Sequence, residues 1–239
     1  MSVSSESHTA RTSVTQRAIE QVTHMISVGE LRPGERLPTE REFAAFLGLS
    51  RSSMREAIRA LTIMGVLEIR HGSGAYVTGL RPSDLLDNLG VVADVSRGET
   101  LVELLQVRRV LEAHATAVAA ARITDEQLVQ VRGHLDRIAQ GRTIEEMVGA
   151  DRDFHRAIVE ASGNATLAAV LDGLSSRTFR ARVWRGHEDE DAVERLHKEH
   201  ERIHGALSRR DPQEAYTAAA SHVMEVESWL RARSGAKTS

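Results

Sequence analysis

The sequence predicts a mainly α protein in two parts: an N-terminal winged helix-turn-helix with a small β-hairpin wing, and a C-terminal all-α antiparallel helical bundle. Three observations support this fold class. The chain has 239 residues, more than the roughly 100 to 150 of a typical single domain. Apolar residues recur at the three-to-four spacing of amphipathic helices through most of the chain. Two short strand-like segments near a Gly-Ser-Gly turn interrupt this pattern once, before residue 78.

The expected domain boundaries follow from these patterns. Residues 1–13 and 233–239 are polar and are expected to be disordered tails. Residues 14–78 form the expected winged helix-turn-helix, and residues 101–232 the helical domain. Between them, residues 79–100 contain Pro82, Gly90 and Gly98 and read as a linker with one short helical stretch.

The elements of the first domain can be placed in order. A helix begins near Val14 and ends near Gly29. After a turn-rich segment with two prolines, Thr39 and Glu42 form a capping box that starts a second helix. A third helix begins at Ser50, with its apolar face on Met54, Ile58, Leu61 and Ile63. The strands are expected at Val66–Ile69 and Ala75–Val77, joined by the hairpin residues His71-Gly72-Ser73-Gly74.

The second domain reads as about six helices and no strand. Capping signals stand at Thr124 and Thr143, and Asp211-Pro212 places proline at the favoured first helical position. Further helices are expected from about Leu101 to Arg122 and near Asn164 and Asp191. We expect Asn164 to cap the helix that it begins rather than to bind a ligand.

Composition excludes several classes of protein. The formal net charge is -3, so a nucleic-acid surface must be local. The chain has no cysteine, which removes disulfides and thiolate metal sites and fits a reducing cytoplasm. Aromatic residues make up only 3%, which disfavours base-stacking RNA-binding platforms. No secretion signal and no run of about 20 apolar residues is present, so we expect a cytoplasmic protein with no membrane partner.

The second and third helices have the frame of a DNA-reading helix-turn-helix. A tight turn at Gly48-Leu49-Ser50 separates them. Ser50, Arg51 and Ser52 crowd the N-terminus of the third helix, where free N–H groups favour a phosphate or a base edge. Arg55 lies one turn on, and arginine can donate two hydrogen bonds to guanine. The alternative is that such arginines only solvate helix faces.

The stretches Leu31–Arg41, Ser50–Ala57 and His71–Val77 resemble the GntR family of regulators. The likeness covers about Val14 to Val77. It implies binding to double-stranded DNA, as a homodimer on an inverted-repeat operator. The residues that it implies for DNA contact are Arg41, Ser50, Arg51, Ser52, Arg55, His71 and Gly72. Gly72 has a structural alternative, because a hairpin tip needs positive φ.

Three helices of the second domain each place a metal-competent side chain in an apolar stripe. Asp151 and His155 are four residues apart and share one helix face. His200 fills the missing inward position among Val193, Leu196, Ile203 and Leu207, with His197 and His204 to its sides. His222 does the same among Ala215, Ala219, Val226 and Trp229. A single histidine of this kind is usually a satisfied core residue, but a set that includes a buried carboxylate indicates a metal site.

The stretches Arg108–Glu112 and Asp151–His155, followed by Ala161–Asn164, resemble the FCD-type effector domain of the same family. In the metal-containing branch, the resemblance implies that Asp151, His155, His200 and His222 are the ligands. A divalent cofactor is expected, with zinc first and nickel, manganese or iron also suited. An open ligand position would accept a small organic acid as effector, with Arg108 as the candidate for its other end. The alternative for Arg108 is an ion pair with Glu112 or another acid.

Two further alternatives stay open at this point. An Asp/His metal site can activate water, as in a metallohydrolase, but no general base stands out and the first 77 residues would have no role. The metal could instead be purely structural. A repressor is expected from family habit, but the sequence does not choose between repressor and activator, and it names neither the effector nor the operator.

Overall fold

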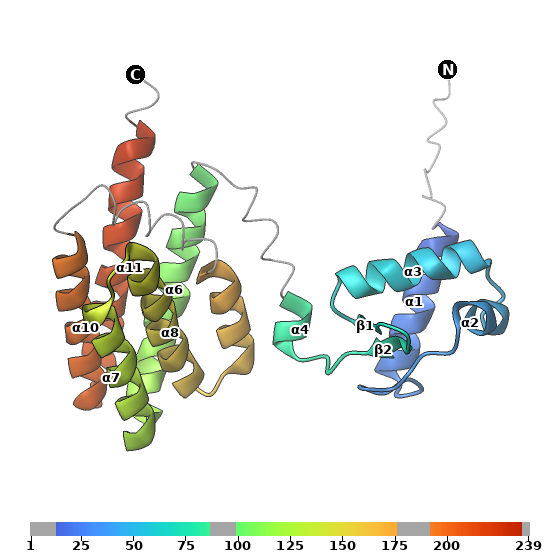
Figure 1. Cartoon of the computed structure of the whole chain (residues 1–239), viewed down its shortest axis with the longest axis horizontal. Coiled ribbons are helices and arrows are strands. Elements are labelled where there is room, and N and C mark those ends of the chain that lie inside the picture. Colours follow the sequence, from blue (N-terminus) through green and yellow to red (C-terminus); the bar gives the residue numbers. More distant parts are fainter. Residues whose placement is uncertain (1–12, 87–98, 176–191, 236–239) are drawn as a thin grey trace, which may run out of the picture. The chain divides into compact units, whose positions relative to one another are not determined.

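The structure is a computed structural model that describes residues 13–86, 99–175 and 192–235. Its contacts divide the chain into two compact units, with the division between Leu85 and Leu86. This division lies inside the segment 79–100 that the sequence suggests as a linker. Figure 1 shows a helical unit with a small hairpin and a second unit made of helices, and each is described by itself below.

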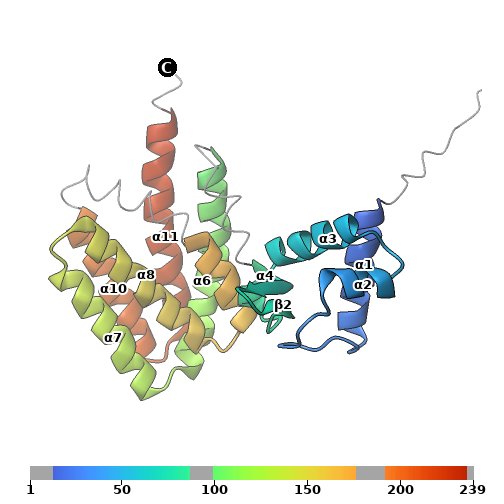
Figure 2. The same cartoon turned by 45° about the vertical axis from the view of Figure 1, so that its right-hand side comes forward.

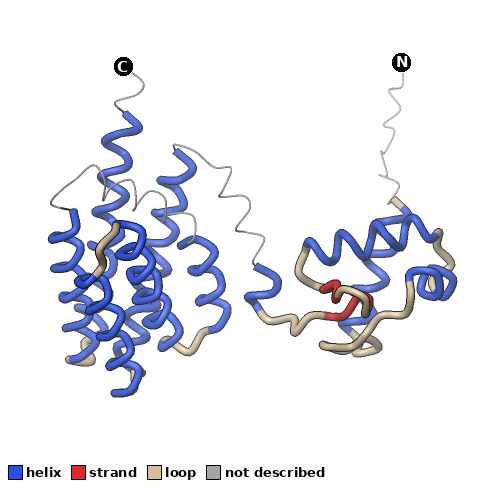
Figure 3. The backbone as a smooth tube through the Cα atoms, viewed as in Figure 1, coloured by secondary structure: helices blue, strands red, loops and turns tan. Residues whose placement is uncertain are grey.

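Three helices and a two-stranded antiparallel sheet make up the first unit. The helices are α1 (Val14–Ser27), α2 (Glu40–Phe46) and α3 (Arg51–Ile63), and the strands are β1 (Leu67–Arg70) and β2 (Gly74–Val77). Figure 3 shows the two strands as the sheet that follows α3. The hairpin pairs Leu67 with Val77 and Arg70 with Gly74, so each strand lies within a residue of its expected position.

The structure corrects the expected start of one helix and confirms that of another. The Ser13 side chain accepts a hydrogen bond from the Gln16 backbone N–H, so Ser13 is an N-cap rather than part of a disordered tail. Thr39 and Glu42 form the predicted capping box of α2. Residues 1–12 of the expected tail lie outside the described residues.

Buried side chains from every element form one core in this unit. Large apolar residues are nevertheless exposed, and one of them, Ile63, was wrongly expected on the apolar face of α3. Phe46 is 73% exposed because the buried face of α2 is centred on Phe43 and Ala44. Ile63 is 69% exposed because it follows the buried Leu61 by two residues, which places it on the opposite side of α3. The core residues are Ala18, Val22, Leu31, Leu37, Phe43, Ala44, Met54, Ala57, Ile58, Leu61, Leu67 and Val77.

A five-residue helix, α4 (Pro82–Leu86), follows the hairpin. It is the short helical stretch expected in the linker. The remainder of the linker, residues 87–98, lies outside the described part of the chain, and the next helix begins at Glu99 rather than Leu101.

Long helices make up the second unit. They are α6 (Glu99–Arg122), α7 (Asp125–Gln140), α8 (Ile144–Ala161), α10 (Ala192–Ser208) and α11 (Pro212–Gly235). Residues 165–175 are also helical, and the described residues of this unit contain no strand. The helix α11 extends to Gly235 and so takes up part of the expected tail 233–239, of which residues 236–239 lie outside the described residues.

The helices pack around a core that holds the polar cluster described below. The most extensive helix pair is α6 with α11, and α7 packs on α8 and α10. Figure 2 shows α6 and α11 running side by side behind α8. Capping boxes at Thr124 and Thr143 start α7 and α8. Asn164 accepts a hydrogen bond from the Leu167 backbone N–H, so it caps the following helix as predicted.

Candidate nucleic-acid interface and metal centre

The N-terminus of α3 presents a cluster of hydroxyl groups and one arginine. The Ser50 side chain caps the helix by accepting a hydrogen bond from the Ser53 backbone N–H at 3.0 Å. Its hydroxyl also lies 2.9 Å from that of Ser52 and 2.8 Å from that of Ser53. Arg51 and Ser52 are exposed. Because these groups lie outside the buried face of α3, they are available to an anionic partner.

Arg55 is tied to the neighbouring helix. Its Nε donates to Glu40 Oε2 at 2.9 Å, and the two side chains are 48% and 37% exposed. Arg41, the residue after Glu40, is exposed on α2. The structure thus places the predicted residues Arg41, Arg51 and Arg55 at the surface of the two helices, and it adds Glu40 as an acidic partner that the sequence reasoning did not weigh.

The hairpin carries the two other predicted contacts. His71 and Gly72 are exposed at its tip, and Gly72 has a φ of 73°. The turn therefore needs glycine for its backbone conformation, whatever its partner. Below the tip, the Tyr76 hydroxyl lies 2.5 Å from that of Ser73, and the Arg70 guanidinium stacks 4.2 Å from the Tyr76 ring centre.

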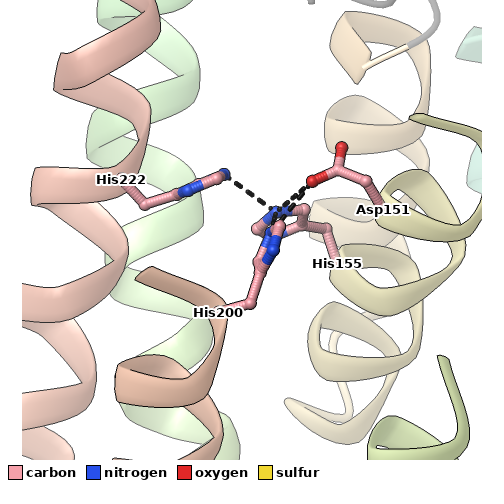
Figure 4. A group of neighbouring side chains, drawn as sticks. All are labelled: Asp151, His155, His200 and His222. Atoms are coloured by element: carbon pink, nitrogen blue, oxygen red, sulfur yellow. Dashed lines mark hydrogen bonds and ion pairs between the residues drawn. The ribbon is translucent and has the colours of Figure 1, made fainter. Parts of the chain in front are cut away.

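The four predicted metal ligands come together in the second unit. Asp151 and His155 lie on α8, His200 on α10 and His222 on α11, as Figure 4 shows. None is more than 4% exposed. One ligand atom from each lies within 4.8 Å of the ligand atoms of the others. Residues 45 and 67 positions apart in sequence thus meet at one point in the core.

The separations between these atoms suit one shared ion. His155 Nε2 lies 3.1 Å from His222 Nε2 and 3.2 Å from His200 Nε2. Asp151 Oδ1 lies 2.9 Å from His200 Nε2 and 3.4 Å from His155 Nε2. Ligands bound at about 2.0 to 2.2 Å around a tetrahedral ion lie roughly 3.3 Å from one another. One carboxylate and three imidazoles are also a donor set that binds divalent transition metals.

The three histidines of the cluster differ in the direction in which their pKa values are shifted. Burial lowers the pKa of His200 to about 4 and that of His222 to about 3. Burial also acts to lower the pKa of His155, but the Glu112 and Asp151 carboxylates outweigh it and raise that pKa. Because a metal binds only the deprotonated imidazole, His200 and His222 are ready to ligate at neutral pH.

Two further carboxylates stand behind the histidines. Glu112 Oε1 lies 2.6 Å from His155 Nδ1, and Glu199 Oε2 lies 2.8 Å from His222 Nδ1. The sequence analysis named Glu112 only as a partner for Arg108 and missed Glu199. A signal for Glu112 was its place on an inward helix face near Arg108, but nothing in the spacing of Glu199 links it to His222 on another helix.

Arg108 takes part in the ion pair that the sequence left open as an alternative. It is 1% exposed, and its Nε donates to Glu112 Oε2 at 2.5 Å. The contact of Arg108 with an effector remains a prediction. His197 and His204, expected at the sides of α10, are half-buried and belong to no ligand cluster among the described residues.

Comparisons with known proteins agree with both units. The family model "Bacterial regulatory proteins, gntR family" matches residues 14–77, and the FCD domain model matches residues 103–225. The chain is 32% identical to the HTH-type transcriptional regulator LutR of Bacillus subtilis, over 86% of this chain and 96% of LutR. It is 30% identical to the HTH-type transcriptional repressor NanR of Klebsiella aerogenes, over 96% of this chain and 90% of NanR.

Two solved structures are similar to the chain in fold. The structure of Streptococcus agalactiae GntR matches with a TM-score of 0.65 at 25% identity, over 89% of this chain and 98% of that one. Escherichia coli McbR/YncC matches with a TM-score of 0.51 at 20% identity, which supports the fold alone. Among the helices that the structure describes, none has both the length and the apolar character of a membrane span.

Proposed function

The chain belongs to the GntR family of bacterial regulatory proteins and carries an FCD domain, and from this premise we propose that it is a metal-dependent, ligand-responsive repressor. That it is a DNA-binding transcription regulator, and not an enzyme, follows from its two domains and its relatives. The metallohydrolase alternative is thereby removed. The repressor role is proposed because the chain is similar to NanR, whose name describes a repressor.

We propose that the protein binds an inverted-repeat operator as a homodimer. Two-fold symmetry doubles the few base pairs that one recognition helix can read. The DNA contacts that we propose come from α2, from the N-terminal half of α3 and from the hairpin tip. The exposure of these residues supports the assignment. They are Arg41, Ser50, Arg51, Ser52, Arg55, His71 and Gly72.

The buried cluster of Asp151, His155, His200 and His222 is the observation that carries the metal part of the proposal. We propose that it holds one divalent ion, with zinc as the first candidate and nickel, manganese and iron as others. The ion would supply an electrophilic position for one end of a small organic acid, which is the effector class that we propose. We propose that Arg108 binds the other end of that acid while it stays paired with Glu112. It cannot leave Glu112 to do so, because a buried Glu112 carboxylate without a counter-charge is unfavourable.

A structural metal is the second candidate, and the burial of the cluster favours it. Structural zinc sites are closed by four protein ligands, whereas sites that bind another molecule keep a position open. All four side chains here are almost fully buried. An ion held in this way would join α8, α10 and α11 whether or not an effector binds.

Operator binding by metal-loaded and metal-free protein separates the two candidates. The operator is first selected from random duplexes with the full-length protein. The sensory proposal expects a panel of small carboxylates to change operator affinity in metal-loaded protein and to have no effect after chelation. If chelation lowers only the melting temperature and no carboxylate acts in either state, the ion is structural.

A further inference from the structure

The three histidine rings of the candidate metal centre differ in what their second ring nitrogen faces. His155 Nδ1 lies 2.6 Å from Glu112 Oε1, and His222 Nδ1 lies 2.8 Å from Glu199 Oε2. His200 Nδ1 is buried and has no hydrogen-bond partner among the residues that the structure describes. The surroundings of the three potential ligands are therefore not equivalent.

We propose that Glu112 and Glu199 are positioning residues that hold His155 and His222 in the Nδ1–H tautomer, so that both Nε2 lone pairs point to one metal position. This inference rests on the proposed function, because it concerns the same metal centre. It assigns a role to two carboxylates that are not themselves expected to be ligands.

The tautomer follows from hydrogen-bond chemistry. An ionised carboxylate can only accept hydrogen bonds, so a ring nitrogen 2.6 to 2.8 Å away must carry the proton. A neutral imidazole has one such proton, which leaves a lone pair on Nε2. The Nε2 atoms of His155 and His222 are only 3.1 Å apart. Two lone pairs at that distance repel each other unless a cation lies between them.

Arg108 completes the support for His155. The Glu112 side chain is only 2% exposed, and a buried carboxylate needs a counter-charge. The Arg108 guanidinium provides it at 2.5 Å. Arg108, Glu112 and His155 thus form a continuous polar chain from α6 to α8 that ends at the ligand cluster.

Glu199 provides a different link. It precedes His200 on α10, yet its side chain reaches His222 on α11. The helix α10 would therefore supply one metal ligand and also orient a ligand on the neighbouring helix. With a side-chain exposure of 20%, Glu199 is a less buried partner than Glu112.

A chain of hydrogen-bonded histidines without a metal is the competing explanation. His200 can donate from Nε2 to His155 with no carboxylate at its Nδ1 among the described residues, so the hydrogen bond that separates the two explanations is the one between His155 and His222. Without a metal, one of these two rings donates from Nε2 to the other. If that ring is neutral, its Nδ1 lone pair faces a carboxylate oxygen at 2.6 or 2.8 Å, which is repulsive. If that ring is doubly protonated, it cannot bind a metal. The two explanations therefore assign different protons to His155 and His222.

The test uses the full-length protein and two isosteric variants, Glu112→Gln and Glu199→Gln. Matched controls on the same helices are Glu103→Gln, at an exposed position of α6, and Glu201→Gln, which removes a surface pairing with Arg132. Zinc affinity is measured by competition with a chromophoric chelator. Because partners behind the ligands typically contribute about 10- to 100-fold in affinity, each test variant should bind zinc about that much more weakly, and both controls should match wild type.

Imidazole ¹H–¹⁵N correlation spectra report which ring nitrogen carries the proton, and this would not change if the two carboxylates only stabilised the fold. In zinc-loaded wild type, His155 and His222 should each show a protonated Nδ1 and a metal-bound Nε2. Glu112→Gln should shift the Nδ1–H signal of His155 alone, and Glu199→Gln that of His222 alone. Spectra of metal-free protein at alkaline pH should show the same tautomers.

Three outcomes overturn the inference: zinc bound through Nδ1 of either ring, the Nε2–H tautomer in the metal-free protein, or wild-type zinc affinity in folded Glu199→Gln. If Glu112→Gln does not fold, Glu199→Gln decides, because its side chain reaches the surface. A wild type that binds no zinc or other divalent ion would remove the proposed metal function. The tautomers of the metal-free protein would then still test the role of the two carboxylates.

Discussion

Replacing Arg51 by alanine should remove specific operator binding without affecting the fold. Arg51 is exposed at the first position of α3, whereas the core face of that helix is made by Met54, Ala57, Ile58 and Leu61. An arginine with two hydrogen bonds to guanine contributes about 1 to 3 kcal/mol of discrimination. In a homodimer the change occurs twice, which gives about 2 to 6 kcal/mol. At about 1.4 kcal/mol per tenfold, operator affinity should fall between roughly 30-fold and 20,000-fold.

The assay is fluorescence anisotropy with a selected operator duplex, together with thermal melting by circular dichroism. Arg59→Ala is the matched control, because Arg59 lies on the same helix and pairs with Glu56 at 2.9 Å. It should change affinity little. The reasoning is refuted if Arg51→Ala binds within twofold of wild type, or if Arg59→Ala loses as much, since the second result would indicate a general charge effect.

Three other predictions concern the ion pair between Glu40 and Arg55, the effect of a bound metal on stability, and the dependence of stability on pH. Glu40→Ala should raise the affinity for random DNA, because it removes a negative charge and releases Arg55, and it should lower the ratio of operator affinity to random-DNA affinity. Parallel titrations with the two duplexes measure that ratio, and an unchanged ratio would contradict the prediction. Chelation should lower the melting temperature of the FCD unit by about 10 to 20 °C, because a ligand at 1,000 times its Kd stabilises the folded state by about 4 kcal/mol. In calorimetry the first unit is the internal control, since it has its own core. An equal shift of both melting transitions would argue against a metal site in the FCD unit. In metal-free protein, the pKa values of His200 and His222 are lowered in the folded state, so unfolding takes up protons below about pH 6.5. The free energy of unfolding should therefore fall from pH 6.5 toward 4, and the raised pKa of His155 opposes this fall only in part. Urea melts across this range would refute the prediction if the free energy of unfolding stayed constant or rose.

Local signals in the sequence predicted much of this fold. The capping boxes at Thr39, Thr124 and Thr143 start helices where expected. The cluster of Asp151, His155, His200 and His222 could also be predicted, because each of its members interrupts an apolar stripe on its own helix, and such an interruption indicates an inward polar group. Helix periodicity therefore carries information about a site even when the helices lie far apart in sequence.

Contacts between side chains on different helices could not be predicted from the sequence in the same way. Glu199 meets His222 only because α10 and α11 pack together. Arg55 likewise meets Glu40 through the packing of α2 on α3. Periodicity shows which side of a helix faces inward, but it does not give the rotation and offset between two helices. The ion pair of Arg108 with Glu112 is different, because the two residues lie four positions apart on α6, and that spacing made the pair one of the two alternatives for Arg108.

Metal stoichiometry tests the central claim most directly. Native mass spectrometry and elemental analysis are applied to wild type, to alanine variants of Asp151, His155, His200 and His222, and to the control His204→Ala. We expect one divalent ion per chain in wild type and in the control, and a loss of metal in each of the four variants. No stoichiometric ion in wild type after loading with each candidate metal, or full retention in all four variants, would contradict the account.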